Sequence, residues 1–201
     1  MPTEVDELLR ERGRTYAEEA GITLRDKPAP LFQLLVLTLL FSAPISAGVA
    51  TASARELFAA GWRTPRRMRE ESTWQQRVDA LGRGGYRRYD ESTARYLEQL
   101  CDRLLEEYGG DLRRLRDDAD GDPARVRRAL QRFDRIGPTG ADIFCREAQR
   151  VWPSLRPYFD KRALDGAKAA HLPKDSRTLA ALVAPEDVAV LAAALVRVDL
   201  G

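Results

Sequence analysis

A glycine turn between two predicted helices contains residue types that could bind a phosphate group. The turn is Ile136-Gly137-Pro138-Thr139-Gly140. Pro138 suits the first position of a helix, where an N–H would have no partner, and Gly137 suits the N-cap. The amides of Thr139 and Gly140 would then point out of the turn, with the positive end of the helix dipole behind them. Such amides can bind phosphate, although a Gly-Pro turn can also be a simple packing corner.

The helix predicted before this turn has an apolar side and a basic side. The apolar residues follow the i, i+3, i+4, i+7 spacing of one buried helix face, and they are Val126, Ala129, Leu130 and Phe133. The basic residues recur on the other side, and they are Arg125, Arg128, Arg132 and Arg135. Arginines beside a phosphate-binding turn indicate contact with DNA, whereas arginines alone are also common on solvated helices.

A second glycine-rich segment combines aromatic and basic residues. It runs Gly84-Gly85-Tyr86-Arg87-Arg88-Tyr89. Arginines can bind phosphates and an aromatic ring can insert between bases, so Arg87, Arg88 and Tyr86 could contact DNA, with Tyr86 as the wedge. The alternative is a surface turn in which Tyr89 packs under the next helix.

These segments must be positioned by helices, because almost the whole chain has helical periodicity and no alternating strand is evident. The sequence therefore predicts an all-α fold. The clearest helix covers residues 90–108, with Asp90 as its predicted N-cap and Gly109-Gly110 at its end. The other helices are predicted near residues 3–20, 29–42, 46–60, 64–70, 73–81, 111–117, 122–134, 138–150, 161–170, 175–183 and 185–198.

Composition places the chain among ordinary globular proteins. It has 201 residues, of which 44% are hydrophobic and 32% charged, and its net charge is +2. That charge does not by itself indicate a nucleic-acid partner. The two cysteines, Cys101 and Cys145, fall in predicted helices and are interpreted as reduced core residues.

One apolar run, Leu31 to Phe41, is the strongest hydrophobic segment. Ser42, Pro44 and Gly48 interrupt it before it reaches the roughly 20 residues of a membrane span, so we interpret it as the central buried helix. Neither end of the chain shows a signal-peptide or lipidation pattern, and a cytoplasmic protein without a membrane partner is expected, nucleoid-associated if bacterial.

Taken in order, these elements resemble the helix-hairpin-helix DNA glycosylase superfamily, in its endonuclease III-like group. The similarity covers roughly residues 28–165. The matching segments are Pro30-Leu31-Phe32-Gln33-Leu34-Leu35, Leu40-Phe41-Ser42-Ala43-Pro44, Leu81-Gly82-Arg83-Gly84-Gly85-Tyr86, the long helix and the hairpin. After the hairpin, Trp152-Pro153 and Asp160 follow as the family's Trp-Pro and catalytic aspartate do.

The resemblance implies two all-helical lobes around a cleft. One lobe would be a bundle of residues 28–149, with the helix-hairpin-helix motif at about 122–150, and the other would combine residues 1–27 with 150–201. The implied partner is double-stranded DNA, including damaged DNA, and a monomer is expected.

The family extrudes a damaged or mispaired base into the cleft and cleaves its N-glycosidic bond, so the resemblance also implies roles for individual residues. Asp160 would be the catalytic carboxylate, although it would also be a good N-cap for the helix beginning at Lys161. Backbone phosphate would be held by Arg135, Gly137, Thr139 and Gly140. The lesion pocket or wedge would be formed by Ser42, Pro44 and Tyr86.

Three departures from the family pattern limit the activity that is expected. Thr139 stands where bifunctional members have the lysine that forms a Schiff base, and Lys161 is better interpreted as a solvated lysine. No cysteine follows Cys145, so the family's iron–sulfur cluster is not expected. Pro44 replaces the wedge glutamine. No side-chain metal site is predicted, although hairpin carbonyls could hold a monovalent cation.

Three functions remain open from the sequence. The first is a monofunctional DNA glycosylase that lacks the lysine-dependent lyase step. The second is a DNA-binding or lesion-sensing protein with no chemistry. The third is an all-α interaction protein in which the hairpin is only a packing corner.

Overall fold

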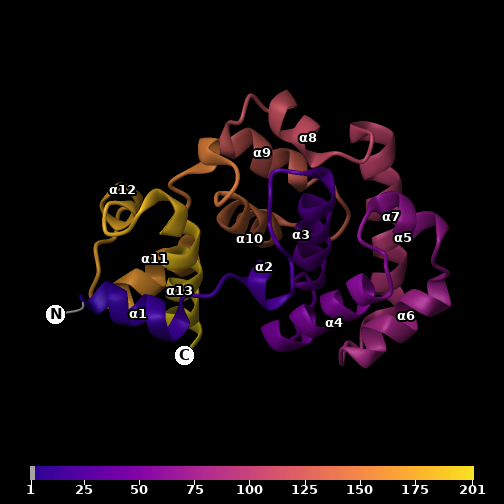
Figure 1. The fold of residues 1–201 in the computed structure, drawn as a ribbon, viewed down its shortest axis with the longest axis horizontal. Helices are drawn as coiled ribbons and strands as arrows, with labels where there is room; N and C mark the ends of the chain where they lie inside the picture. The colour runs from indigo at the N-terminus through magenta and orange to yellow at the C-terminus, as the bar shows by residue number, and fades with distance from the viewer. Residues whose placement is uncertain (1–2) are drawn as a thin grey trace.

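The computed structural model describes residues 3–201, and within them the protein consists of helices and loops without a strand (Figure 1). Each helical segment predicted from the sequence contains a helix. In chain order they are α1 (Glu4–Arg12), α2 (Tyr16–Glu19), α3 (Pro28–Leu40), α4 (Ala47–Ala59), α5 (Pro65–Glu70), α6 (Trp74–Arg83), α7 (Asp90–Tyr108), α8 (Leu112–Asp118), α9 (Pro123–Leu130), α10 (Pro138–Ala148), η1 (Pro153–Leu155), α11 (Lys161–Ala169), α12 (Ser176–Ala180), η2 (Pro185–Asp187) and α13 (Val188–Leu200). The predicted all-α class is confirmed.

Short polar residues begin most of these helices, because their side chains accept a hydrogen bond from an otherwise unpaired amide of the first turn. The capping residues are Thr3, Thr15, Ser46, Thr64, Thr73, Asp111, Asp122, Asp160 and Asp175. Gly109 ends α7 in the left-handed conformation with φ of 62°, as predicted.

Two predicted helix starts or spans are wrong in detail. The segment predicted as one helix over residues 3–20 is divided, because Gly13 caps α1 and Thr15 begins α2 with a capping box to Glu18. Asp90 is the first residue of α7 and not its N-cap, which is Tyr89. The Asp90 carboxylate instead accepts a hydrogen bond from the amide of the next residue at 2.8 Å.

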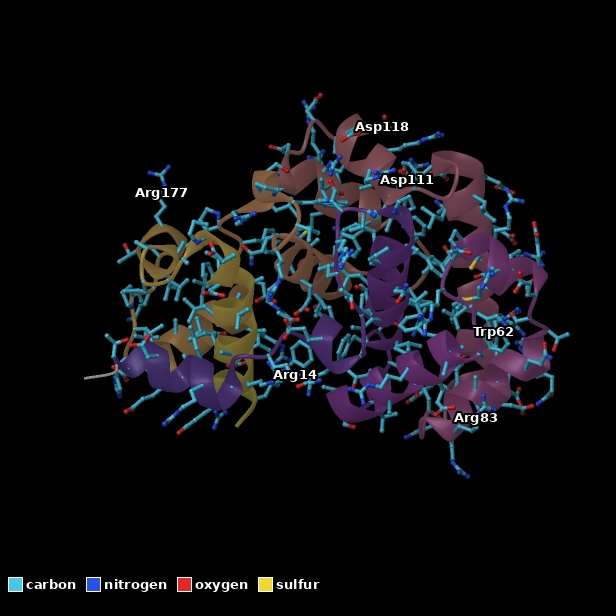
Figure 2. The ribbon with its side chains drawn as sticks, viewed as in Figure 1. Arg14, Trp62, Arg83, Asp111, Asp118 and Arg177 are labelled. Atoms are coloured by element: carbon cyan, nitrogen blue, oxygen red, sulfur yellow. The ribbon has the colours of Figure 1, made fainter. Side chains whose placement is uncertain are left out.

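Helix α3 is the centre of the larger part of the molecule, as its apolar sequence predicts. Leu31, Phe32 and the run Leu34–Leu40 are buried, and α3 contacts α4, α7, α8 and α10. No helix within residues 3–201 is long and apolar enough to cross a membrane. Charged side chains such as Arg83 and Arg177 extend away from the ribbon (Figure 2).

Helices α5, α6 and α9 pack on α7, α4 and α10 of this larger group, whereas α1 and α11 pack on α13 in a second group (Figure 1). Gly166 permits a close crossing of α11 and α13, since a Cβ there would lie 1.9 Å from the carbonyl oxygen of Leu195. Helix α10 contacts α3 as well as α13, and α2 contacts α4. The two groups therefore meet along α10, while the predicted domain boundaries at residues 27/28 and 149/150 stay a prediction.

Candidate active site and nucleic-acid interface

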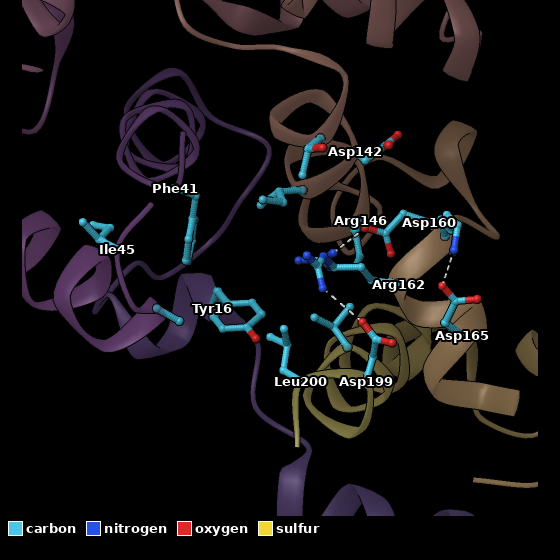
Figure 3. Close-up of a pocket in the computed structure, with 15 residues that line it drawn as sticks. Tyr16, Phe41, Ile45, Asp142, Arg146, Asp160, Arg162, Asp165, Asp199 and Leu200 are labelled. Atoms are coloured by element: carbon cyan, nitrogen blue, oxygen red, sulfur yellow. Dashed lines mark hydrogen bonds and ion pairs between the residues drawn. The ribbon is translucent and has the colours of Figure 1, made fainter. Parts of the chain in front are cut away.

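A pocket of about 520 Å³ opens where α2, the end of α3, α10, α11 and α13 meet (Figure 3). Its walls combine aromatic and apolar side chains with several ion pairs. The lining residues are Tyr16, Phe41, Ile45, Ala47, Thr139, Asp142, Ile143, Arg146, Asp160, Lys161, Arg162, Asp165, Val196, Asp199 and Leu200. The pocket thus brings Thr139 of the hairpin and Asp160 together, which lie 21 positions apart in the sequence.

Asp160 caps α11 and also faces this pocket. Its Oδ1 accepts a hydrogen bond from the amide of Ala163 at 3.1 Å, as the sequence predicts for an N-cap. Its Oδ2 accepts a hydrogen bond from Arg146 Nη1 at 2.6 Å. The carboxylate is therefore fixed by a helix cap on one oxygen and by a buried cation on the other, and its catalytic role stays a prediction.

Arg146 is a pocket residue that the sequence analysis did not identify. It lies seven residues after Thr139 on α10, so both side chains lie on one face of that helix, with Asp142 between them. Its side chain is only 2% exposed, and its Nε is buried without an acceptor among the described residues. The polar spacing of positions 139, 142 and 146 on a helix that is otherwise largely buried is the signal that could have indicated it.

An aromatic wall lies beside these charges. The rings of Tyr16 and Phe41 pack edge to face with centroids 5.4 Å apart. The Arg197 guanidinium lies 4.3 Å from the Tyr16 ring centroid, and that of Arg146 lies 5.8 Å from it. Burial raises the pKa of the Tyr16 hydroxyl, so this ring stays neutral and holds the wall of the pocket between two cations.

Glu147, next to Arg146, ties α2 to α10 from inside the protein. Its Oε2 accepts a hydrogen bond from the amide of Ala17 at 2.9 Å, and its Oε1 has no partner within the described chain. Burial raises the pKa of this carboxyl group, although the charge of Arg146 acts in the opposite direction. Glu147 therefore fixes the helix that carries Tyr16.

The predicted hairpin between α9 and α10 is present and has an irregular turn. Arg135 has a left-handed φ of 68°, and its guanidinium lies 5.5 Å from the Tyr96 ring centroid. Gly137 is the N-cap of α10, Pro138 is its first residue, and no side chain caps this end. The first helical hydrogen bond comes from Ala141 to the Gly137 carbonyl, so the preceding amides have no helical acceptor.

The phosphate-binding role of the hairpin stays a prediction, and the structure gives Gly140 a packing role as well. Gly137 and Thr139 are exposed, whereas Gly140 is buried. A Cβ at Gly140 would lie 3.3 Å from Ile136 Cγ2 and 3.6 Å from Thr38 Cγ2. Gly140 therefore also allows close packing of the turn against α3.

The prediction that Tyr86 is a wedge or contacts DNA is wrong in this structure. Its side chain is 1% exposed, and its hydroxyl donates a hydrogen bond to the Leu40 carbonyl at 3.1 Å. An apolar ring gains more from burial under α3 than from exposure in a loop. Arg87 and Arg88 are exposed but do not line the pocket, and their contact with DNA stays a prediction.

In the α3–α4 loop, the residues that line the pocket are not the ones that the sequence predicts. Ser42 and Pro44 are exposed and do not line the pocket, whereas Phe41 and Ile45 do. A role of Ser42 and Pro44 as a wedge beside the pocket stays a prediction. Lys161 is exposed and bonds to Asp165, which agrees with its interpretation as a solvated lysine.

The chain has two cysteines, whereas the cluster of the family takes four, and the expectation that no cluster is bound stays a prediction. Cys101 and Cys145 are free and buried in α7 and α10, and the segment from α11 to α13 contains no cysteine. The predicted binding of a monovalent cation by the hairpin stays a prediction.

Comparison with known proteins supplies a match in structure but not in sequence. No protein-family description and no curated protein sequence matches the chain. A solved structure of a trapped endonuclease III–DNA covalent intermediate, in an estranged-adenine complex, matches with a TM-score of 0.53 and 17% sequence identity. The match covers 98% of this chain and 85% of that chain. The protein therefore has an endonuclease III-like fold.

Proposed function

We propose that this protein binds double-stranded DNA and acts in base-excision repair as a monofunctional DNA glycosylase. One observation carries the proposal: the Asp160 carboxylate and the hairpin residue Thr139 line the same pocket. A hairpin that holds backbone phosphate beside a pocket with a carboxylate can place an extruded nucleotide against that carboxylate.

The walls of the pocket suit such a nucleotide. Tyr16 and Phe41 offer apolar rings against which a base can pack, and Asp160 offers a negative charge for the sugar. Cleavage of a glycosidic bond passes through a cation-like sugar, which a nearby carboxylate stabilises. Asp160 would supply this stabilisation and orient the attacking water.

Strand cleavage by the lyase route is not part of the proposal. The hydroxyl of Thr139 cannot form an iminium with the sugar carbon. Lys161 bonds to Asp165, and its side chain is 87% exposed. The protein would therefore release a base and leave an abasic site.

Binding of the DNA backbone would use the hairpin. The amides at the start of α10 lack a side-chain cap and carry the positive end of the helix dipole, and Arg135 is exposed beside them. Such contacts predict a binding constant that falls steeply as the salt concentration rises. A single copy of the chain would suffice for them.

The pairing of Asp160 with Arg146 favours a second candidate function, a lesion sensor without chemistry. A guanidinium at 2.6 Å offsets much of the carboxylate charge that would stabilise a cationic sugar. In this alternative the pocket admits a base, and the glycosidic bond of that base is not cleaved.

A glycosylase assay separates the two candidates. Duplexes with one uracil, oxidised, alkylated or mismatched base are incubated with the protein, and alkali then reveals abasic sites. Release by the native protein that is lost in Asp160→Asn but kept in Arg77→Lys, a control outside the pocket, supports the glycosylase when both variants are shown to be folded. Salt-sensitive binding without release from any duplex supports the sensor, and no binding at all contradicts both.

A further inference from the structure

We propose that Arg146 reads the extruded base and selects neutral bases that present carbonyl oxygens, against bases that alkylation has made cationic. This inference rests on the proposed pocket for an extruded base and names the class of base that it accepts. Arg146 and Arg162 both line the pocket (Figure 3).

Arg146 has hydrogen-bond donors that no described residue uses. Arg146 carries five N–H groups, and within residues 3–201 one of its nitrogens, Nη1, donates to Asp160. Its Nη2 makes no hydrogen bond with the described residues and is not among their fully buried unpaired atoms, so it can be reached from the pocket that Arg146 lines, whereas Nε is fully buried. An unsatisfied donor in a buried side chain favours a ligand that brings an acceptor.

The carboxylates of the pocket, which could attract a cationic base, already have basic partners. The four aspartates of the pocket each accept a hydrogen bond from a basic side chain. The pairs are Asp142 with Arg127, Asp160 with Arg146, Asp165 with Lys161 and Asp199 with Arg162. The negative charges are thus already matched by cations, whereas N–H groups of Arg146 remain for a ligand.

The acceptors that a base presents decide how well it pairs with Arg146. An arginine fork recognises adjacent acceptors on a purine, such as the O6 and N7 atoms of a keto purine. Hypoxanthine keeps both acceptors. Uracil is neutral and presents two carbonyl oxygens, which N3 separates, so that one of them at a time can accept a hydrogen bond from Arg146. The base 7-methylguanine has lost the N7 acceptor to a methyl group and carries a positive charge, for which the pocket holds no unpaired carboxylate.

The test compares three duplexes that differ in a single base, which is hypoxanthine, uracil or 7-methylguanine. Binding affinity and base release are both measured, each relative to the undamaged duplex. We expect the hypoxanthine and uracil duplexes to be preferred over the 7-methylguanine duplex by about ten- to hundredfold, the range for a hydrogen bond to a charged group. Equal or stronger action on 7-methylguanine would overturn the inference.

Two matched variants assign the preference to one side chain. Arg146→Lys keeps the positive charge and removes the planar fork, so the preference should fall at least severalfold. Arg77→Lys alters an arginine that is equally buried, with a side chain 2% exposed and 2.6 Å from a glutamate, but does not line the pocket. It should keep the native preference. A preference that survives in Arg146→Lys would refute the role of Arg146.

These readouts also separate this inference from the proposed function. Preferential binding of the hypoxanthine and uracil duplexes without any base release keeps the inference and removes the glycosylase. Release of 7-methylguanine in preference to the other two bases keeps the glycosylase and removes the inference. The absence of any lesion-dependent binding or release contradicts both. If Arg146→Lys does not fold, the preference of the native protein alone still decides.

Discussion

The ion pair between Asp160 and Arg146 makes a strong prediction about stability. Asp160→Asn keeps an oxygen that can cap α11, since Asn and Asp are equally good N-caps, and so removes the charge alone. It leaves the Arg146 guanidinium, with a side chain 2% exposed, without a counterion. Stranding one partner of a buried pair costs about 3–5 kcal/mol. For a chain of this length that corresponds to a fall in Tm of about 6–20 °C.

Asp175→Asn is the matched control. Asp175 caps α12 by accepting a hydrogen bond from the amide of Thr178 at 2.9 Å, but it is exposed and forms no ion pair with the residues that the structure describes. Its substitution should therefore cost only the loss of a carboxylate at a helix N-terminus, about 0.3–1 kcal/mol. Unfolding in urea, followed by far-ultraviolet circular dichroism, measures both variants.

The double variant Asp160→Asn with Arg146→Met tests the cause. Removing the stranded guanidinium should recover much of the loss, and the double-mutant cycle should give a coupling energy of about 2 kcal/mol or more. A loss in Asp160→Asn no larger than that in Asp175→Asn would refute the buried pair. The result also bears on the glycosylase assay, because activity lost in Asp160→Asn counts only at a temperature where the variant is folded.

Three further changes test the surroundings of the pocket. Burial raises the pKa of Glu147 in the folded protein, so the native protein should lose stability as the pH rises from about 4.3 toward that raised pKa. The stability of Glu147→Gln should not fall over this pH range, and urea unfolding midpoints measured across pH would show the difference. Tyr86→Phe should cost about 1 kcal/mol in urea unfolding by leaving the carbonyl at the end of α3 unpaired, and an unchanged midpoint would contradict that bond. Gly166→Ala should lower the free energy of unfolding by about 1–3 kcal/mol, because a methyl group would overlap the backbone of Leu195. Gly48→Ala has open space around its Cβ and should be neutral or stabilising, and thermal unfolding of both variants makes the comparison.

The sequence predicted the fold well because helix signals are local. Apolar spacing, polar N-caps and the glycines that end helices each act within a few residues, and they placed α3, α7 and the hairpin correctly. The same local signals failed for Tyr86, because a Gly-rich loop with arginines has the composition of a DNA contact whether or not its aromatic ring is buried. The Tyr86 hydroxyl bonds to the carbonyl of Leu40, 46 residues earlier, and no local pattern indicates such a contact.

The site was predictable only in part, because its chemistry depends on contacts between distant segments. Asp160 could be identified from its place after the hairpin, but its partner Arg146 is one arginine among many in the sequence. What distinguishes Arg146 is burial on the face of α10 that also carries Thr139. A buried arginine needs a nearby acceptor, which Asp160 supplies here. If Arg146 recognises the base as we propose, the residue that restrains the carboxylate also selects the lesion, and lesion recognition and the charge of Asp160 are coupled through a single side chain.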